Sequence, residues 1–144
     1  TIPTSVAPGQ GKVLQVVQGT YNSSNVNTTS TTYVDTDLEA SITPSSTSNK
    51  ILITGTFQGQ ATANGIYSLF RGTTNLIAPR GFFRLEVANK QTGYAFSFLD
   101  TPSSSSQIEY KLRMKNNGSG TVYFNPGGSD NMATIQLLEI EGWL

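Results

Sequence analysis

The chain has 144 residues, no cysteine, no histidine, a formal net charge of zero and only 12% charged residues. These counts exclude disulfides, thiolate chemistry and a Ser-His-Asp triad, and the balanced charge argues against nucleic-acid binding. No apolar run approaches the ~20 residues that a membrane span needs, so we expect no membrane insertion.

The composition nevertheless predicts a folded chain. Apolar residues make up 36% and aromatic residues 10%, which is the opposite of the disordered signature. More than a third of the residues are Ser, Thr, Asn or Gln. We expect residues 1–11, which are punctuated by Pro and Gly, to form a lead-in or linker, and residues 12–144 to form a single domain.

Short segments rich in β-branched and aromatic residues recur along the chain, separated by turn residues. This spacing is typical of an all-β sandwich or barrel, and no segment carries a convincing helical pattern. The stretch 22–32 is rich in Ser, Thr and Asn, and the stretch 101–106 is rich in Ser. Both are predicted to be solvated loops. The predicted strands are 13–18, 38–43, 50–58, 66–71, 82–88, 94–99, 107–114, 121–125 and 132–140.

The predicted strands are of two kinds. The segment 107–114 alternates strictly, with Glu109, Lys111 and Arg113 on one face, so that face is expected to meet water. The segments 50–58, 94–99 and 132–140 are apolar on both faces. A sandwich has only one inside, so such strands need a second cover, and with no helix available we expect another copy of the chain.

This argument predicts a homo-oligomer. The candidate subunit-interface residues are Tyr94, Phe96 and Phe98, which share one face of their strand, together with Leu52. The alternative is that the small residues Ala, Ser and Thr of the second faces are tolerated at an ordinary surface, since much of any protein surface is apolar.

The residues offer no set of catalytic groups. Asp35, Asp37 and Glu39 alternate and would point the same way in a strand, where they could hold Ca²⁺, but a solvent-facing strand is the favoured interpretation. The other acids are scattered, so a glycosidase pair is not indicated. We therefore expect no enzyme, no metal site and no cofactor.

Ligand binding without catalysis stays open. Uncharged amides and hydroxyls on loops, with an aromatic ring nearby, can bind sugars. The candidate contact residues are Tyr21 and Asn22 in one loop, and Asn125, Asp130 and Asn131 in another. The alternative is that these residues only build turns.

Three blocks of sequence together resemble a known family. They are GKVLQVVQGTY with STTYVDTDLEASITPSSTSNKILI (11–21 and 30–53), YSLFRGTTNLI with AFSFLDTPSSSSQIEYKL (67–77 and 95–112), and GTVYFNPGG with ATIQLLEIEG (120–128 and 133–142). They are similar to a domain of fibre and other virion-surface proteins of tailed bacteriophages, especially marine and cyanobacterial ones, where it often lies near the C-terminus. The TTYVD…SITPSSTSNKILI and FLDTP motifs are the more specific parts.

The resemblance implies a structural protein of the virion surface, a tail or head fibre. It implies a trimeric antiparallel β-sandwich, a jelly-roll-like knob, with other virion proteins and a glycan or protein of the host surface as partners. It carries no catalytic residues to this chain. Two alternatives stay open, namely a capsid decoration or minor structural protein, and a carbohydrate-binding lectin module.

Overall fold

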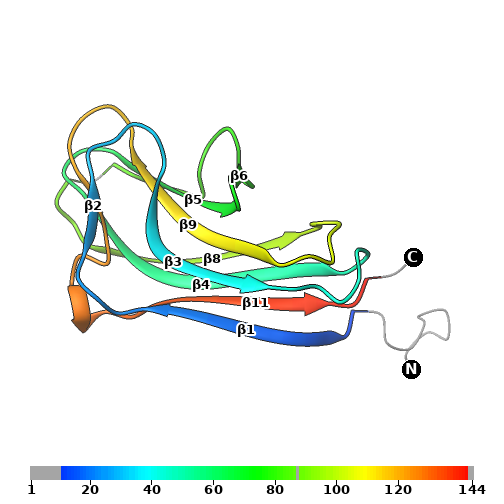
Figure 1. Ribbon diagram of the computed structural model, residues 1–144. Coiled ribbons are helices and arrows are strands. Elements are labelled where there is room, and N and C mark those ends of the chain that lie inside the picture. Colours follow the sequence, from blue (N-terminus) through cyan, green and yellow to red (C-terminus); the bar gives the residue numbers. More distant parts are fainter. Residues whose placement is uncertain (1–10, 87, 143–144) are drawn as a thin grey trace, which may run out of the picture.

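The computed structural model describes residues 11–86 and 88–142, which form two antiparallel β-sheets packed face to face (Figure 1). The only helix in these residues is a single 3₁₀ turn, η1 (Gly128–Asp130). The strands are β1 (Val13–Tyr21), β2 (Val26–Thr28), β3 (Val34–Ile42), β4 (Lys50–Ala61), β5 (Gly65–Arg71), β6 (Thr74–Asn75), β7 (Phe83–Leu85), β8 (Thr92–Asp100), β9 (Ile108–Asn116), β10 (Val122–Phe124) and β11 (Ala133–Ile140).

The first sheet is built around β4, the longest strand. β11 pairs with one edge of β4 and carries β1 on its other side, while β8 pairs with the opposite edge of β4. Beyond β11, the last residues of β4 pair with β10, which pairs in turn with β2. In the second sheet β9 lies between β3 and β5, and β6 and β7 pair with β5.

All nine predicted segments contain a strand, in the predicted order. Two predictions need correction. The stretch 22–32 is not entirely loop, because β2 forms within it by pairing with β10. The predicted strand 82–88 is shorter, since β7 ends at Leu85. Apart from Gly11, the predicted lead-in lies outside the described residues.

Alternate residues of both sheets face one core. Phe57 of β4 lies at its centre, with ring centroids 4.9 Å from Tyr67 and 5.9 Å from Phe124. Close approach requires glycine at two inward positions of β4. A Cβ at Gly59 would lie 2.5 Å from the Tyr67 hydroxyl, and one at Gly55 would lie 2.5 Å from the Phe96 ring.

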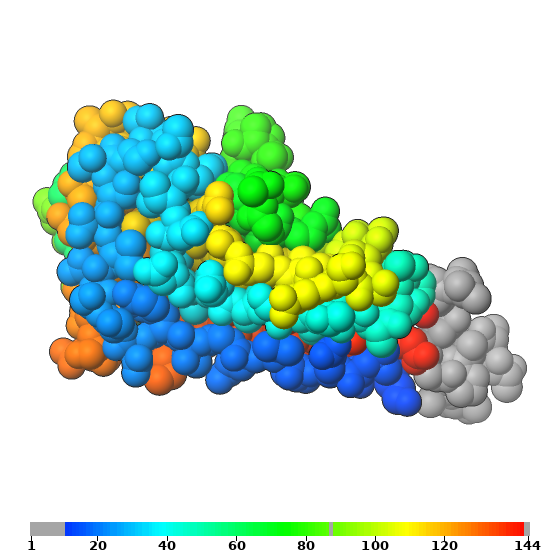
Figure 2. Space-filling view, viewed as in Figure 1, coloured from blue at the N-terminus to red at the C-terminus, as the bar shows by residue number. Residues whose placement is uncertain are grey.

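The sheets close along one long edge, where β1 and β3 lie side by side (Figure 2). Gly19 of β1 permits this contact, since a Cβ there would lie 2.0 Å from the Glu39 carbonyl oxygen. The chain enters and leaves the sandwich together, because Glu141 donates its backbone N–H to Lys12 at 2.8 Å. We call this end the base, and the opposite end, with loops 22–25, 117–120 and 126–129, the loop end (Figure 1).

A buried carboxylate links the two sheets. Asp100, at the end of β8, accepts two hydrogen bonds from Arg71 of β5, at 2.7 and 2.8 Å, and one from the Tyr110 hydroxyl of β9 at 2.7 Å. The Asp100 side chain is 7% exposed and that of Arg71 31%. Burial, followed by the contact with Asp100, raises the pKa of Tyr110, so this phenol stays a hydrogen-bond donor.

A second buried carboxylate lies at the base. Glu139 of β11 is 1% exposed. It accepts hydrogen bonds from Asn49 at 2.7 Å, from the Ser45 backbone N–H at 2.6 Å and hydroxyl at 2.9 Å, and from Gln15 at 2.6 Å. Burial opposes ionisation, but these four donors outweigh it and lower the pKa of Glu139.

The Asp100 linkage should be worth far more than a surface ion pair. We expect Asp100→Asn to lower the free energy of unfolding by about 2 kcal/mol, since it weakens three hydrogen bonds to a buried carboxylate. The matched control is Glu86→Gln, which removes an ion pair to Arg84 whose side chains are 55% and 64% exposed. It should change stability by less than about 1 kcal/mol. Urea denaturation of both variants measures this, and equal losses would contradict it.

The Glu139 network should make stability depend on acid. Because the folded pKa is lowered, its contribution is complete above the unfolded pKa and is lost as pH falls through the folded pKa. We expect the wild type to lose more unfolding free energy than Glu139→Gln does when the pH falls below about 4.5, measured by urea denaturation. Identical pH slopes in the two proteins would rule out this role for Glu139.

Candidate functional site

The outer faces of the two sheets differ in charge. On the second sheet, β9 turns Glu109, Lys111 and Arg113 outward, as predicted, beside the acids of β3. Lys111 lies 2.6 Å from Glu109 and 3.3 Å from Asp35, and Arg113 lies 2.6 Å from Asp35. We call this the charged face, and its ion pairs are those of an ordinary solvent-facing sheet.

These contacts bear on the calcium alternative. The carboxylate of Asp35 is bound by Lys111 and Arg113, and that of Glu39 lies 3.8 Å from Lys111. Asp37 adopts a φ of 67° where the register between β3 and β9 shifts. Among the described residues, no group of three or more acids is placed to hold a metal ion.

The outer face of β1, β11, β4 and β8 carries no charged side chain from its aliphatic row to the loop end, and Lys50, opposite Ile140 at the base end of β4, lies at its margin. The aliphatic row runs straight across all four strands, since Val16 pairs with Leu138, Leu138 with Leu52, and Leu52 with Leu99. Val16 is 61% exposed and Leu99 51%. The next aliphatic pair, Val13 and Ile140, extends this row toward the base. We call this surface the uncharged face.

Beyond the aliphatic row, the uncharged face is polar. Gln136 of β11 donates to Gln18 of β1 at 2.9 Å and accepts from Thr54 of β4 at 3.0 Å. The Thr56 and Thr134 hydroxyls lie 3.2 Å apart in the following row. These side chains satisfy one another across the strands. A surface with exposed aliphatic side chains and no charge between this row and the loop end is suited to contact with another molecule.

The predicted interface residues divide between the two sides of the sheet. Leu52 lies on the uncharged face. Tyr94, Phe96 and Phe98 turn inward instead, with Phe96 6% exposed and the other two half-buried against the core. For Phe96 the interface prediction is wrong, because Gly55 opposite makes room for its ring inside the sandwich.

Alternation within one strand shows that two faces exist but not which of them is inside. The outward residues Val16, Leu99 and Leu138 were therefore missed as contact candidates. They could have been found from the alignment of aliphatic residues across neighbouring strands, but this alignment appears only when the register of four strands is known.

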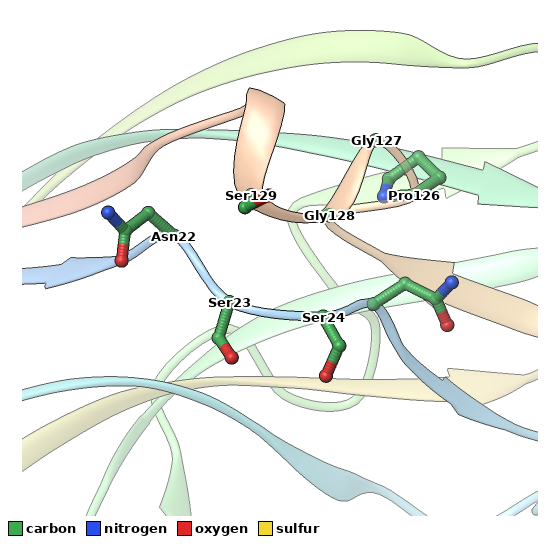
Figure 3. A pocket seen from close by; sticks show the side chains of 8 residues that line it. Asn22, Ser23, Ser24, Pro126, Gly127, Gly128 and Ser129 are labelled. Atoms are coloured by element: carbon green, nitrogen blue, oxygen red, sulfur yellow. The ribbon is translucent and has the colours of Figure 1, made fainter.

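The loop end brings two predicted ligand loops together. Residues 22–25 and 126–129 line an open groove of about 580 Å³ (Figure 3). All of its side chains are uncharged, and those of Ser23 and Ser24 point away from the turn 126–129, so much of the wall between them is backbone. The groove can form hydrogen bonds, but it offers no acid, base or nucleophile of unusual pKa.

The candidate contact residues have different positions there. Asn22 lines the groove, whereas Asp130 is exposed and Asn131 half-buried outside it. Tyr21 is used structurally, because its ring packs 5.4 Å from that of Phe124 and its hydroxyl donates to the Ser24 carbonyl at 2.6 Å.

Asn125 positions the groove and is not exposed to a ligand. It is fully buried, with a φ of 54°. Its amide donates to the Ser23 carbonyl at 3.1 Å and to the Gly128 carbonyl at 2.9 Å, and so ties both loops together. Prediction of Asn125 as a contact residue is therefore corrected, since its side chain is buried and its amide nitrogen holds the two walls.

Comparison with known proteins adds no relative, because no protein-family model and no curated protein matches the chain. Across residues 11–86 and 88–142, no helix has the length and hydropathy to cross a membrane.

The two functions of Asn125 can be separated by substitution. Asn125→Ala should lower the free energy of unfolding by about 3 kcal/mol, about 2 from two lost hydrogen bonds and about 1 from the left-handed backbone. Asn125→Gly removes the same hydrogen bonds but tolerates a positive φ, so it should lose about 1 kcal/mol less. Denaturation curves of both variants test this, and an alanine variant as stable as the glycine variant would contradict the backbone argument.

Proposed function

We propose that this chain is a structural protein of the virion surface of a tailed bacteriophage, the knob of a tail or head fibre. In this proposal it forms a homotrimer and contacts the host surface through its loop end. The observation that carries the proposal is the uncharged face, on which four strands turn no charged side chain outward from the aliphatic row to the loop end, with Lys50 at the base margin.

The order of the strands supports a jelly-roll architecture. One sheet runs β1, β11, β4, β8 and the other β3, β9, β5, β7, with successive long strands placed in opposite sheets. Eight strands in two such sheets are typical of jelly rolls, which occur in viral capsid proteins and lectins. This architecture agrees with the resemblance of the sequence to virion-surface domains.

Burial of the uncharged face between subunits would remove its aliphatic row from water. Half-exposed Val16 and Leu99 gain most from such burial, and the Gln and Thr side chains already hydrogen-bond one another, so covering them leaves few unsatisfied groups. A cyclic assembly of about 1,000 Å² or more for each pair of subunits would have the size of a specific interface.

The two ends of the sandwich suit an attached knob. The base joins Lys12 and Glu141 and is stiffened by the buried Glu139 network, while the groove lies at the opposite end. Held by the base, the domain would present its loop end outward. A fibre needs the distal end to be free for contact with a surface.

Two alternatives follow from the same surfaces. A capsid decoration protein would use the uncharged face or base against the capsid, and electron microscopy of intact particles separates it from a fibre by its position. A lectin module would use the groove, whose backbone and amide groups can bind hydroxyls, and a glycan array tests this with the isolated domain.

The trimer can be tested by adding one positive charge to the uncharged face and, as a control, to the charged face. We expect the wild type to be trimeric by sedimentation equilibrium at micromolar concentration, and Val16→Lys or Leu99→Lys to be monomeric, because each buries a cation in an apolar contact. Both positions are more than half exposed within one chain, so folding should be unaffected.

The matched control is Ser41→Lys, which adds the same charge on β3 of the charged face, opposite Glu109. It should leave the mass unchanged. A wild type that is monomeric throughout, or a control that dissociates as the uncharged-face variants do, would refute the proposed assembly.

A further inference from the structure

A cleft lined by cations lies on the charged-face side of the loop end, away from the groove. It has a volume of about 510 Å³ and lies between the segment 79–84 and the ends of β5 and β9. The segment is held firmly against β5, since Phe82 donates its backbone N–H to the Tyr67 carbonyl at 2.8 Å. A Cβ at Gly81 would lie 2.4 Å from that same carbonyl oxygen, so the wall approaches as closely as a glycine allows.

Three of the nine basic residues line this cleft, and no acidic residue does. Arg84 pairs with Glu86 at 3.0 Å, but both side chains are more than half exposed, so this pair is weak and can rearrange. Arg80 and Lys115 form no ion pair within the described residues. In contrast, Lys111 and Arg113 on the neighbouring charged face are each bound by carboxylates.

Lys115 is held in place by an aromatic ring. Its ammonium group lies 4.9 Å from the centroid of the Tyr33 ring, a cation–π contact that orients the side chain. The result is a positive potential in a concave site with partly apolar walls, where charge is screened less than on a flat surface. A chain of zero net charge has no general attraction for anions, so this concentration of cations is local.

The rest of the lining favours a sugar over a bare ion. Ile66 gives the cleft an apolar wall, since it pairs with Arg84 on one side and Lys115 on the other, whereas the rings of Phe82 and Phe83 pack inward against Phe96 and Tyr94. Asn117 contributes an exposed amide at the loop end. Cations for an acidic substituent, an aliphatic wall for the apolar face of a pyranose and an amide for hydroxyls together match an acidic saccharide.

We propose that this cleft binds an acidic polysaccharide through its carboxylate, sulfate or phosphate groups, with Arg80 and Lys115 as the principal anion contacts. Nucleic acid is not favoured, because it needs a basic track and the adjoining charged face carries acids. The inference rests on the proposed function only for the source of the glycan on a host surface, and the cleft itself is tested independently.

Calorimetry with three oligosaccharides of matched length tests the proposal, namely an oligouronide, a sulfated oligosaccharide and neutral dextran. We expect at least one acidic ligand to bind and dextran not to bind. Affinity should fall as NaCl rises from about 0.1 M to about 1 M, which shortens the Debye length from about 10 Å to about 3 Å. The preferred acidic ligand identifies a carboxylate or a sulfate-like group.

The double variant Arg80→Gln with Lys115→Gln should weaken binding at least about tenfold, since it removes two charge-assisted contacts. Lys12→Gln is the matched control, because it removes a positive charge at the base. Arg80 is exposed. Arg80→Gln alone therefore carries the test if the double variant fails to fold, as judged by thermal unfolding.

The proposal is overturned if no acidic oligosaccharide binds, if dextran binds equally, or if Lys12→Gln weakens binding as much as the cleft variants do. Inorganic sulfate or phosphate binding as tightly as the oligosaccharides would overturn the saccharide assignment. Val16→Lys changes only the proposed assembly and should bind the oligosaccharide like the wild type. Failure of the proposed trimer can therefore be distinguished from failure of the proposed binding cleft.

Discussion

The packing of two sheets around the aromatic centre of β4 determines everything else in this molecule. Phe57 lies among rings from both sheets, and the inward glycines Gly55 and Gly59 let the Phe96 ring and the Tyr67 hydroxyl approach the β4 backbone. This closes one apolar interior. Because side chains alternate along a strand, filling that interior leaves each sheet one outer face. The two outer faces then differ: one is covered by ion pairs, and the other by an aliphatic row and hydrogen-bonded amides and hydroxyls.

Two buried carboxylates link the sheets near the base. Asp100 connects β8 with β5 and β9, and Glu139 accepts hydrogen bonds from β1 and from the loop between β3 and β4 at the base. Both carboxylates are buried and fully used in hydrogen bonds, so they stabilise a particular alignment of the sheets. The loop end is held by neutral hydrogen bonds, among them those of the Asn125 amide to both groove loops. A rigid body with its irregular segments gathered at one end suits presentation of a surface for binding.

Much of the fold could be predicted, because β propensity and turn residues are local properties. β2 escaped prediction since the tract around Val26 has no alternation, and it becomes a strand only by pairing with β10. The inward position of Phe96 escaped for a different reason, since it depends on a glycine in a neighbouring strand. The groove joins two loops about 100 residues apart in the chain, and each was a candidate by itself. The cleft was not foreseen, because Arg80 and Lys115 belong to no motif and meet only across β5 and β9.

The sequence by itself determined that the chain is all-β, that it lacks the residues for thiol or histidine chemistry, and that some strands are apolar on both faces. These conclusions depend on composition and on period-2 alternation, which need no knowledge of neighbours. The tertiary structure alone decided which face of each strand is inside, that Val16, Leu138, Leu52 and Leu99 form one row, and that Arg80, Arg84 and Lys115 line one cleft. Strand register and sheet packing bring together residues that are distant in the chain. The sequence of a single strand contains no signal for its register with its neighbours or for its packing against the other sheet.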